Sequence, residues 1–267
     1  MNSVANRVLR VALPLIVLAA VIGIWQLVTT LAPSFFFPTA TRIGDAIADL
    51  YFSGPPEHFF LSDAFFSEVV PSLARLFSGW ALGALVGIIL GFVVGLLPRV
   101  AGYVDPVLQF LRSVPPPVII PLYLILFGIG DEMKVLFIAT GVLWPVLLNT
   151  IDGVRNVPTT QLDTAQAFKI RVPDRLLHVV LPAALPKIFA GLTIGVAVAI
   201  VVMVLSEMFA ATNGIGYMLL QGQRGFRFPD MWGEVVLLGI IGFLFNTLLL
   251  FVEHRVLKWH RQSKGTI

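Results

Sequence analysis

The sequence predicts an all-α integral membrane protein with about six transmembrane helices. Of its 267 residues, 57% are hydrophobic and only 12% are charged, whereas soluble domains carry about 25% charged residues. A soluble fold of this size cannot bury so much apolar surface, so lipid must be the solvent. The chain has no cysteine, which excludes disulfides, thiol catalysis and cysteine metal sites. Its net charge of +3 is too small to indicate binding to nucleic acid.

Six apolar segments are long enough to cross a bilayer, whose core of about 30 Å needs about 20 helical residues. The first follows Arg7 and Arg10, as in a signal peptide, but exceeds the usual core of about 7–15 residues, so we expect a retained helix. The six are Val11–Leu31, Leu73–Leu97, Val104–Phe127, Val135–Ile151, Ile188–Phe209 and Val235–Phe251.

The third segment is not expected to be one straight helix. Prolines remove backbone donors and kink helices, and in hydrocarbon they are tolerated where neighbouring helices or a water path satisfy the freed groups. Five fall within this segment: Pro106, Pro115, Pro116, Pro117 and Pro121.

The basic residues orient the chain. With the N-terminus inside, 12 Lys and Arg lie on the inner face and 5 on the outer face, and Arg112 lies within the third segment, which accounts for all 18. The positive-inside rule then places both termini in the cytoplasm. Residues 33–72, with a short helix after Thr39, and residues 210–234 are expected outside. No internal repeat or soluble domain is evident, so we expect one membrane domain over residues 1–267.

A polar loop, residues 153–187, interrupts the apolar pattern on the expected cytoplasmic side. Thr159 or Thr160 can cap a helix, Thr160-x-x-Asp163 has capping-box spacing, and the helix is expected to run through Ala165 and Phe168. Pro173 suits the first turn of a second helix, which Pro182 and Pro186 are expected to end before the fifth segment. Two short helices of this kind are either a docking surface or a solvated connector, and the residues alone favour neither.

The loop resembles the coupling loop of ABC importer permeases. That motif is Glu-Ala-Ala, a glycine four residues later, and then Leu-Pro; this chain has Asp163-Thr-Ala165, Lys169 at the glycine position, and Leu181-Pro182. Further stretches resemble the branch that imports nitrate, sulfonates and taurine, and the likeness covers about residues 69–251. These stretches are Val114–Pro117, Pro121–Gly130, Leu148–Val154, Glu207 and Gly214–Tyr217.

The resemblance implies a type I ABC importer permease fold in a bacterial inner membrane. It also implies a second permease subunit, expected to be identical, two cytoplasmic ATPases that hold ATP and Mg, and an extracytoplasmic solute-binding protein. This chain would be non-catalytic and hold no cofactor or metal, and it has no Gly-x-x-x-x-Gly-Lys-Ser/Thr with which to bind nucleotide phosphates. The residues implied to contact the ATPase are Asp163, Ala165, Phe168, Lys169, Leu181 and Pro182.

Two residues depart from the family motif. Asp163 replaces glutamate, which shortens the acid but keeps its charge. Lys169 replaces the glycine of a sharp turn, and a left-handed lysine would cost about 1 kcal/mol. We therefore expect the turn over Phe168–Pro173 to be built differently.

Polar residues within apolar segments are candidates for the transport path or its gate, because ionisable groups in hydrocarbon usually face a partner or water. Arg75 either snorkels to the interface or pairs with Glu207, and Glu207 either pairs with Arg75, contacts the cargo or gates the outer mouth. Arg112 either lines a cavity at the proline break or anchors the chain at the inner interface. Asn149 either caps the fourth segment or bonds to a neighbouring helix. Gly83, Gly87, Gly91 and Gly95 predict a small-residue ridge for close helix packing. The candidates are Arg75, Arg112, Pro115, Pro116, Asn149 and Glu207.

Two other functions compete with an importer permease. An intramembrane protease needs an embedded nucleophile and base or metal ligands. Its motifs are lacking, and the four histidines fall in loops or at segment ends. A secondary transporter or channel could use an Arg–Glu pair as a proton relay, but it would not need the polar loop.

Overall fold

A computed structural model describes residues 3–258, without the side chains of residues 3–11, 98–101 and 210. Arg261 and Lys264, which entered the count of inner charges, lie outside the described residues. Over the described range the regular elements are all helical, which confirms the all-α prediction. The chain forms two compact units, Met1–Val69 with Met218–Leu237, and Val70–Tyr217 with Leu238–Ile267. A single membrane domain over residues 1–267 stays a prediction.

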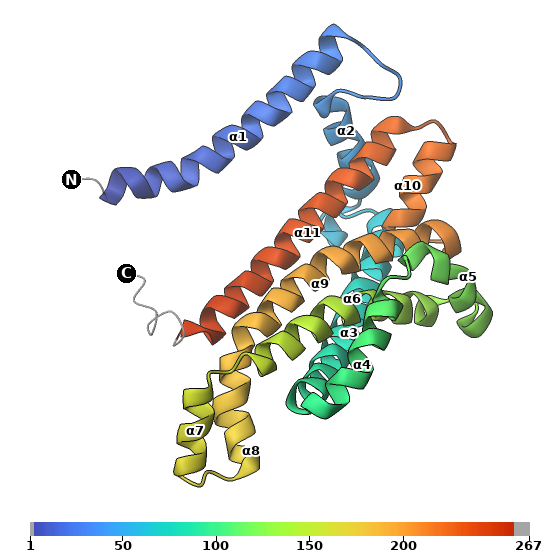
Figure 1. The fold of residues 1–267 in the computed structure, drawn as a ribbon. Coiled ribbons are helices and arrows are strands. Elements are labelled where there is room, and N and C mark those ends of the chain that lie inside the picture. Colours follow the sequence, from blue (N-terminus) through green and yellow to red (C-terminus); the bar gives the residue numbers. More distant parts are fainter. Residues whose placement is uncertain (1–2, 259–267) are drawn as a thin grey trace. The chain divides into compact units, whose positions relative to one another are not determined.

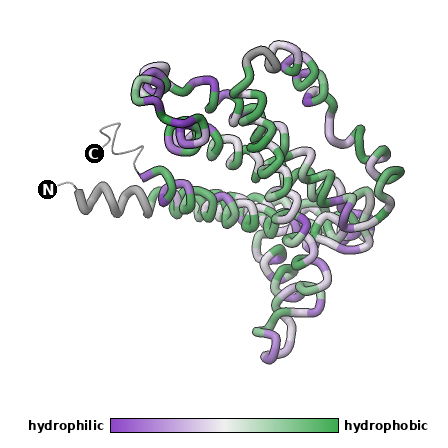
Figure 2. The backbone as a smooth tube through the Cα atoms, turned by 90° about the horizontal axis from the view of Figure 1, so that it is seen from below, coloured by the Kyte–Doolittle hydropathy of each residue, from purple (hydrophilic) through white to green (hydrophobic). Residues whose placement is uncertain are grey.

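Five helices among the described residues are long and apolar enough to cross a membrane, and a bent pair makes a sixth candidate. Figure 2 shows hydrophobic residues along the length of these helices. The chain is therefore a multi-pass membrane protein with about six spans, as predicted. The five are Ala12–Leu31, Phe65–Leu96, Asp131–Arg155, Val172–Phe209 and Phe228–Val256.

The third predicted segment is broken. Helix α4 (Pro98–Arg112) and helix α5 (Pro116–Phe127) meet at 92°, which confirms the prediction that Val104–Phe127 is not one straight helix. Pro115 caps α5 in an extended conformation, with ψ 133°. A residue that precedes proline is driven out of the α region, whereas proline itself fits the first turn of a helix. Consecutive prolines therefore end one helix and start the next.

The larger unit is built around α3 (Val70–Leu96), α6 (Asp131–Arg155) and α9 (Leu181–Ala210), which lie side by side in Figure 1. A glycine ridge on α3 faces α6. A Cβ atom at Gly83 would lie 2.4 Å from the carbonyl oxygen of Ala139, and one at Gly91 would lie 2.5 Å from Cβ of Thr150. The structure confirms the predicted ridge and adds Gly79, whose Cβ would lie 2.6 Å from that of Ile138.

The fifth span begins earlier than predicted. Helix α8 (Val172–Arg175) leads through a π-helical turn, Leu176–Val180, directly into α9. The prediction that Pro182 and Pro186 end a helix is wrong. Pro182 lies in the first turn of α9, where its missing N–H costs little, and Pro186 lies inside the helix.

The smaller unit contains α1 (Ser3–Leu31), α2 (Ala40–Tyr51), most of α10 (Ile215–Arg224) and the first turns of α11 (Phe228–Val256). The short helix predicted after Thr39 is present, and the Thr39 hydroxyl accepts from the N–H of Arg42. Tyr51, at the end of α2, donates to Oε1 of buried Glu234 at 2.5 Å. Burial, and then the Glu234 carboxylate, raise the pKa of Tyr51 far above its ordinary value.

The glycine ridge gives a direct test of close packing. Replacing Gly83 by alanine puts a methyl group against the α6 backbone, and overpacking of this kind costs about 1–3 kcal/mol. We expect Gly83→Ala to lower the thermal unfolding temperature of the detergent-solubilised protein. Gly239→Ala is the control, because a Cβ there meets no atom within 4 Å. An equal effect of the two substitutions would contradict the packing described here.

Candidate functional site

The polar loop folds into a helical hairpin. Helix α7 (Thr159–Ala167) and helix α8 extend beyond the ends of α6 and α9 in Figure 1. Pro158 is the N-cap residue of α7 and gives no side-chain hydrogen bond, so the predicted capping box is wrong. The helix starts at Thr159, so Thr160 lies inside its first turn. Asp163 is then too far along the helix to accept a hydrogen bond from the backbone at the N-cap. Pro173 lies in the first turn of α8, as predicted.

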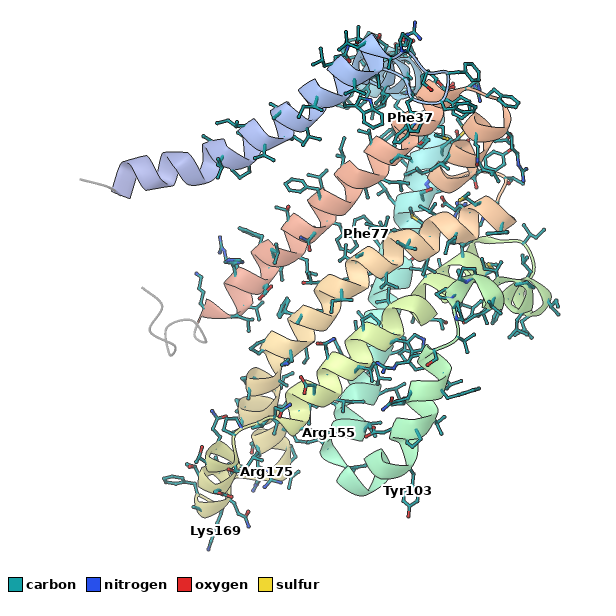
Figure 3. All side chains as sticks on the ribbon, turned by 45° about the horizontal axis from the view of Figure 1, so that its top comes forward. Phe37, Phe77, Tyr103, Arg155, Lys169 and Arg175 are labelled. Atoms are coloured by element: carbon teal, nitrogen blue, oxygen red, sulfur yellow. The ribbon has the colours of Figure 1, made fainter. Side chains whose placement is uncertain are left out.

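The turn between α7 and α8 contains a left-handed lysine. Lys169 has φ +52° and lies at the far end of the hairpin in Figure 3. Its N–H donates to the carbonyl of Gln166 at 2.9 Å, and the N–H of Ile170 donates to that of Ala165 at 3.0 Å. These two bonds form a Schellman motif, which usually has glycine at this position. The expectation of a differently built turn is therefore wrong: lysine adopts the conformation that glycine favours.

The six predicted ATPase contacts do not form one surface. Ala165 is 2% exposed and lies in the interior of the hairpin, and Leu181 and Pro182 are half-buried at the start of α9. Asp163 and Lys169 are exposed, and Phe168, the C-cap residue of α7, is 79% exposed. Lys187 forms an ion pair with Asp152 at 2.7 Å, which joins the two helices that carry the hairpin.

A buried polar cluster lies at the other end of α9. Arg75 is 3% exposed and Glu207 is fully buried, and Nη1 of Arg75 lies 2.8 Å from Oε1 of Glu207. Acceptors lie within 3.2 Å of every guanidinium nitrogen. Asn213 offers its carbonyl to Nη1 and its Oδ1 to Nη2, and Asp131 accepts from Nε at 2.8 Å. The snorkelling interpretation of Arg75 therefore fails, because its guanidinium points into protein.

Glu207 is also bonded to α3 and to the start of α10. Ser72 donates to Oε1 at 2.7 Å, and the backbone N–H of Gly216 donates to Oε2 at 2.9 Å. Gly214 packs directly against the carboxylate: a Cβ there would lie 2.5 Å from Cδ of Glu207, and φ is +119°. Each carboxylate oxygen thus has a fixed donor, which offsets the cost of a buried charge.

Lys134 also borders this cluster, with Nζ 3.5 Å from Oδ1 of Asp131. Sequence reasoning missed four of its members: Ser72, Asp131, Lys134 and Asn213. One signal was available: Ser72 and Arg75 are three residues apart, so they share a helix face. The partners on α6 and after α9 are distant in sequence, and a single sequence does not pair them.

The other predicted path residues do not join the cluster. Asn149 donates to the carbonyl of Pro145 within its own helix at 2.8 Å. It is not at a helix end, because α6 continues to Arg155. The prediction that Asn149 caps the span or bonds to a neighbour is wrong. Arg112 is exposed at the end of α4, and Pro115 and Pro116 form the break. Among the described residues, neither Arg112 nor Asn149 bonds to Arg75 or Glu207.

Glu207→Gln tests what the cluster supports. Breaking a buried ion pair by changing one partner costs about 3–5 kcal/mol, so we expect a clear loss of thermal stability in the purified protein. Glu132→Gln is the control, because that carboxylate is exposed one residue from Asp131. A Glu207→Gln protein that is stable but hydrolyses ATP without uptake, in complex with its ATPase, would favour a gate instead. Exchanging the two residues cannot restore the pair, because Gly214 and Gly216 leave no room for arginine at 207.

Residues 83–260 match the family described as binding-protein-dependent transport system inner membrane component. The chain is 31% identical to the taurine transport system permease protein TauC of Escherichia coli, over 94% of this chain and 90% of that protein. It is 29% identical to a putative aliphatic sulfonates transport permease, SsuC of Bacillus subtilis, over 92% and 87%. Identity to the nitrate import permease NrtB of Leptolyngbya laminosa is 28%, over 96% and 91%.

The fold matches a solved structure of the MetNI methionine ABC transporter in an inward-facing conformation. The TM-score is 0.61 at 20% identity, over 72% of this chain and 93% of that chain. This likeness shows the fold alone, and it confirms the predicted importer permease architecture. The chain therefore belongs to the family of binding-protein-dependent transport system inner membrane components, the non-catalytic permease subunits of ABC importers.

Proposed function

We propose that this chain forms, with a second identical copy, the translocation path of an ATP-driven importer for a small sulfonate, taurine or nitrate-like solute. A solute-binding protein delivers the solute outside, and two ATPase subunits hold ATP and Mg in the cytoplasm. The relatives named above support the solute class, because their names refer to sulfonates, taurine and nitrate.

The exposed end of the α7–α8 hairpin carries the proposal. Phe168 holds a large apolar side chain in solvent where α7 ends in a Schellman turn, next to Lys169 in the chain, and Asp163 is exposed on α7. Buried aromatic anchors flanked by polar groups dominate protein interfaces. Phe168 is therefore the anchor that we expect an ATPase groove to receive, and Asp163 and Lys169 are the charged rim.

The same geometry supplies a route for coupling. Helix α9 has 30 residues, a length of about 45 Å at 1.5 Å per residue. It begins at the hairpin and carries Glu207 near its other end. Closure of the ATPases on ATP would displace the hairpin. Because α9 is one continuous helix from the hairpin to Glu207, this displacement would reach the buried cluster with no flexible loop in between.

The proposed topology has six spans in a bacterial inner membrane with both termini in the cytoplasm. The excess of basic residues on the hairpin side supports it. The hairpin then faces the ATPases, and α2 and the Glu207 end of α9 lie on the outer side.

Charge and shape changes on the hairpin test the coupling surface. We expect Asp163→Lys and Phe168→Asp each to abolish uptake and to weaken co-purification of the ATPase at least about tenfold, a loss typical of an interface anchor. Membrane insertion should survive, because both side chains are exposed. Tyr103→Asp is a matched control, since this exposed aromatic lies on α4, away from the hairpin (Figure 3). Normal ATPase recovery with both hairpin variants would exclude the assignment.

Single cysteines test the topology without a background signal, because the native chain has none. In whole cells, an impermeant maleimide should label His58→Cys and Gln223→Cys. Arg171→Cys and Arg261→Cys should be labelled only after permeabilisation. Labelling of position 171 from outside would reverse the orientation and remove the hairpin from the ATPases.

A further inference from the structure

Two buried cations share one exposed carboxylate at the start of α6. The side chains of Arg75 and Lys134 are 3% and 4% exposed, whereas that of Asp131 is 67% exposed. Nε and Nη2 of Arg75 each lie 2.8 Å from Oδ1 of Asp131, and Nζ of Lys134 lies 3.5 Å from the same oxygen. One acceptor atom therefore serves three donors from two cations.

Lys134 is poorly satisfied by this arrangement. The remaining donors of Arg75 are held in the interior by Glu207 and Asn213. Within the described part of the chain, Lys134 has only the long contact to Asp131. A buried ammonium with one weak contact is costly. An anion with several oxygens, placed between Arg75 and Lys134, would satisfy both cations better than a single carboxylate oxygen does.

The carboxylate is on the first residue of α6, directly after a glycine turn, whereas Arg75 is buried on α3 and Lys134 is buried one turn further along α6. Asp131 follows Gly128–Gly130, and a Cβ atom at either glycine would meet no atom within 4 Å. Gly128 also has φ +70°, a backbone conformation that glycine adopts without steric cost. Asp131 can therefore leave Arg75 and Lys134 by movement of this turn, without disturbing α3 or the rest of α6.

We propose that Arg75 and Lys134 form an anion-binding site on the transport path, and that Asp131 occupies it until a sulfonate or similar oxyanion replaces it. The inference rests on the proposed function for its solute class. Charge supports it: Arg75, Lys134, Glu207 and Asp131 are neutral together, so departure of Asp131 leaves one positive charge. That charge matches a monovalent anion.

The test uses the permease–ATPase complex in nanodiscs, without binding protein or ATP, and ethanesulfonate as the probe. Calorimetric titration gives its affinity. Removing the competing carboxylate with Asp131→Asn should raise the affinity about tenfold, as expected when a site blocked about nine-tenths of the time is freed. Adding Lys134→Gln to that variant should abolish the gain. Asp105→Asn is the control, because it removes a half-exposed ion pair between α4 and Arg155, at the opposite end of α6 from Asp131.

Unchanged ethanesulfonate affinity in Asp131→Asn would overturn the proposal and leave Asp131 as a structural ion pair. If Asp131→Asn does not assemble, Lys134→Gln alone decides: a loss of affinity supports the site, and wild-type affinity overturns it. The binding assay needs no uptake, so it tests the anion site separately from the proposed transport function. A gain in affinity in a complex that imports no sulfonate would reject the proposed solute but keep the site. Sulfonate uptake with unchanged affinity would reject the site alone.

Discussion

The close approach of α3 to α6 determines where the functional side chains lie. The glycine ridge on α3 recurs every four residues, so it stays on one helix face and allows the α6 backbone to pack where side chains would otherwise stand. Arg75 lies one step before Gly79 on the same ridge. It is therefore directed at the first turn of α6, which carries Asp131 and Lys134. Without the glycines, the guanidinium would be held too far from α6 to bond to Asp131 at 2.8 Å.

The buried cluster converts this packing into a defined joint between three long helices. Van der Waals contacts alone would allow the helices to slide, because apolar side chains have no preferred partner. The bonds from Ser72 and Arg75 on α3 to Glu207 on α9 fix the register of those helices, and Asp131 extends the link to α6. Removing the charge of either Arg75 or Glu207 leaves a buried polar partner uncompensated. The joint is thus expensive to break, and this favours two discrete arrangements of the helices over a continuous range.

Local signals in the sequence predicted the features that depend on composition and spacing. Apolar length located the spans, the four-residue repeat located the ridge, and the isolated charges Arg75 and Glu207 marked the cluster. Features that depend on tertiary context were not predictable. Pro182 should stop a helix, but the π-helical turn before it places it at a helix start. Nothing local in the sequence indicates that Arg75 faces Asp131 and Lys134.

The left-handed Lys169 has an electrostatic consequence. Its backbone conformation costs about 1 kcal/mol relative to glycine, yet its position immediately after α7 places a cation at the negative end of the helix dipole. Such a charge stabilises a helix by about 0.3–1 kcal/mol, an attraction that dissolved salt screens. The two effects nearly cancel in dilute buffer, whereas at high ionic strength only the conformational cost remains. The stiffness of the hairpin thus depends on the ionic strength of the solution that surrounds it.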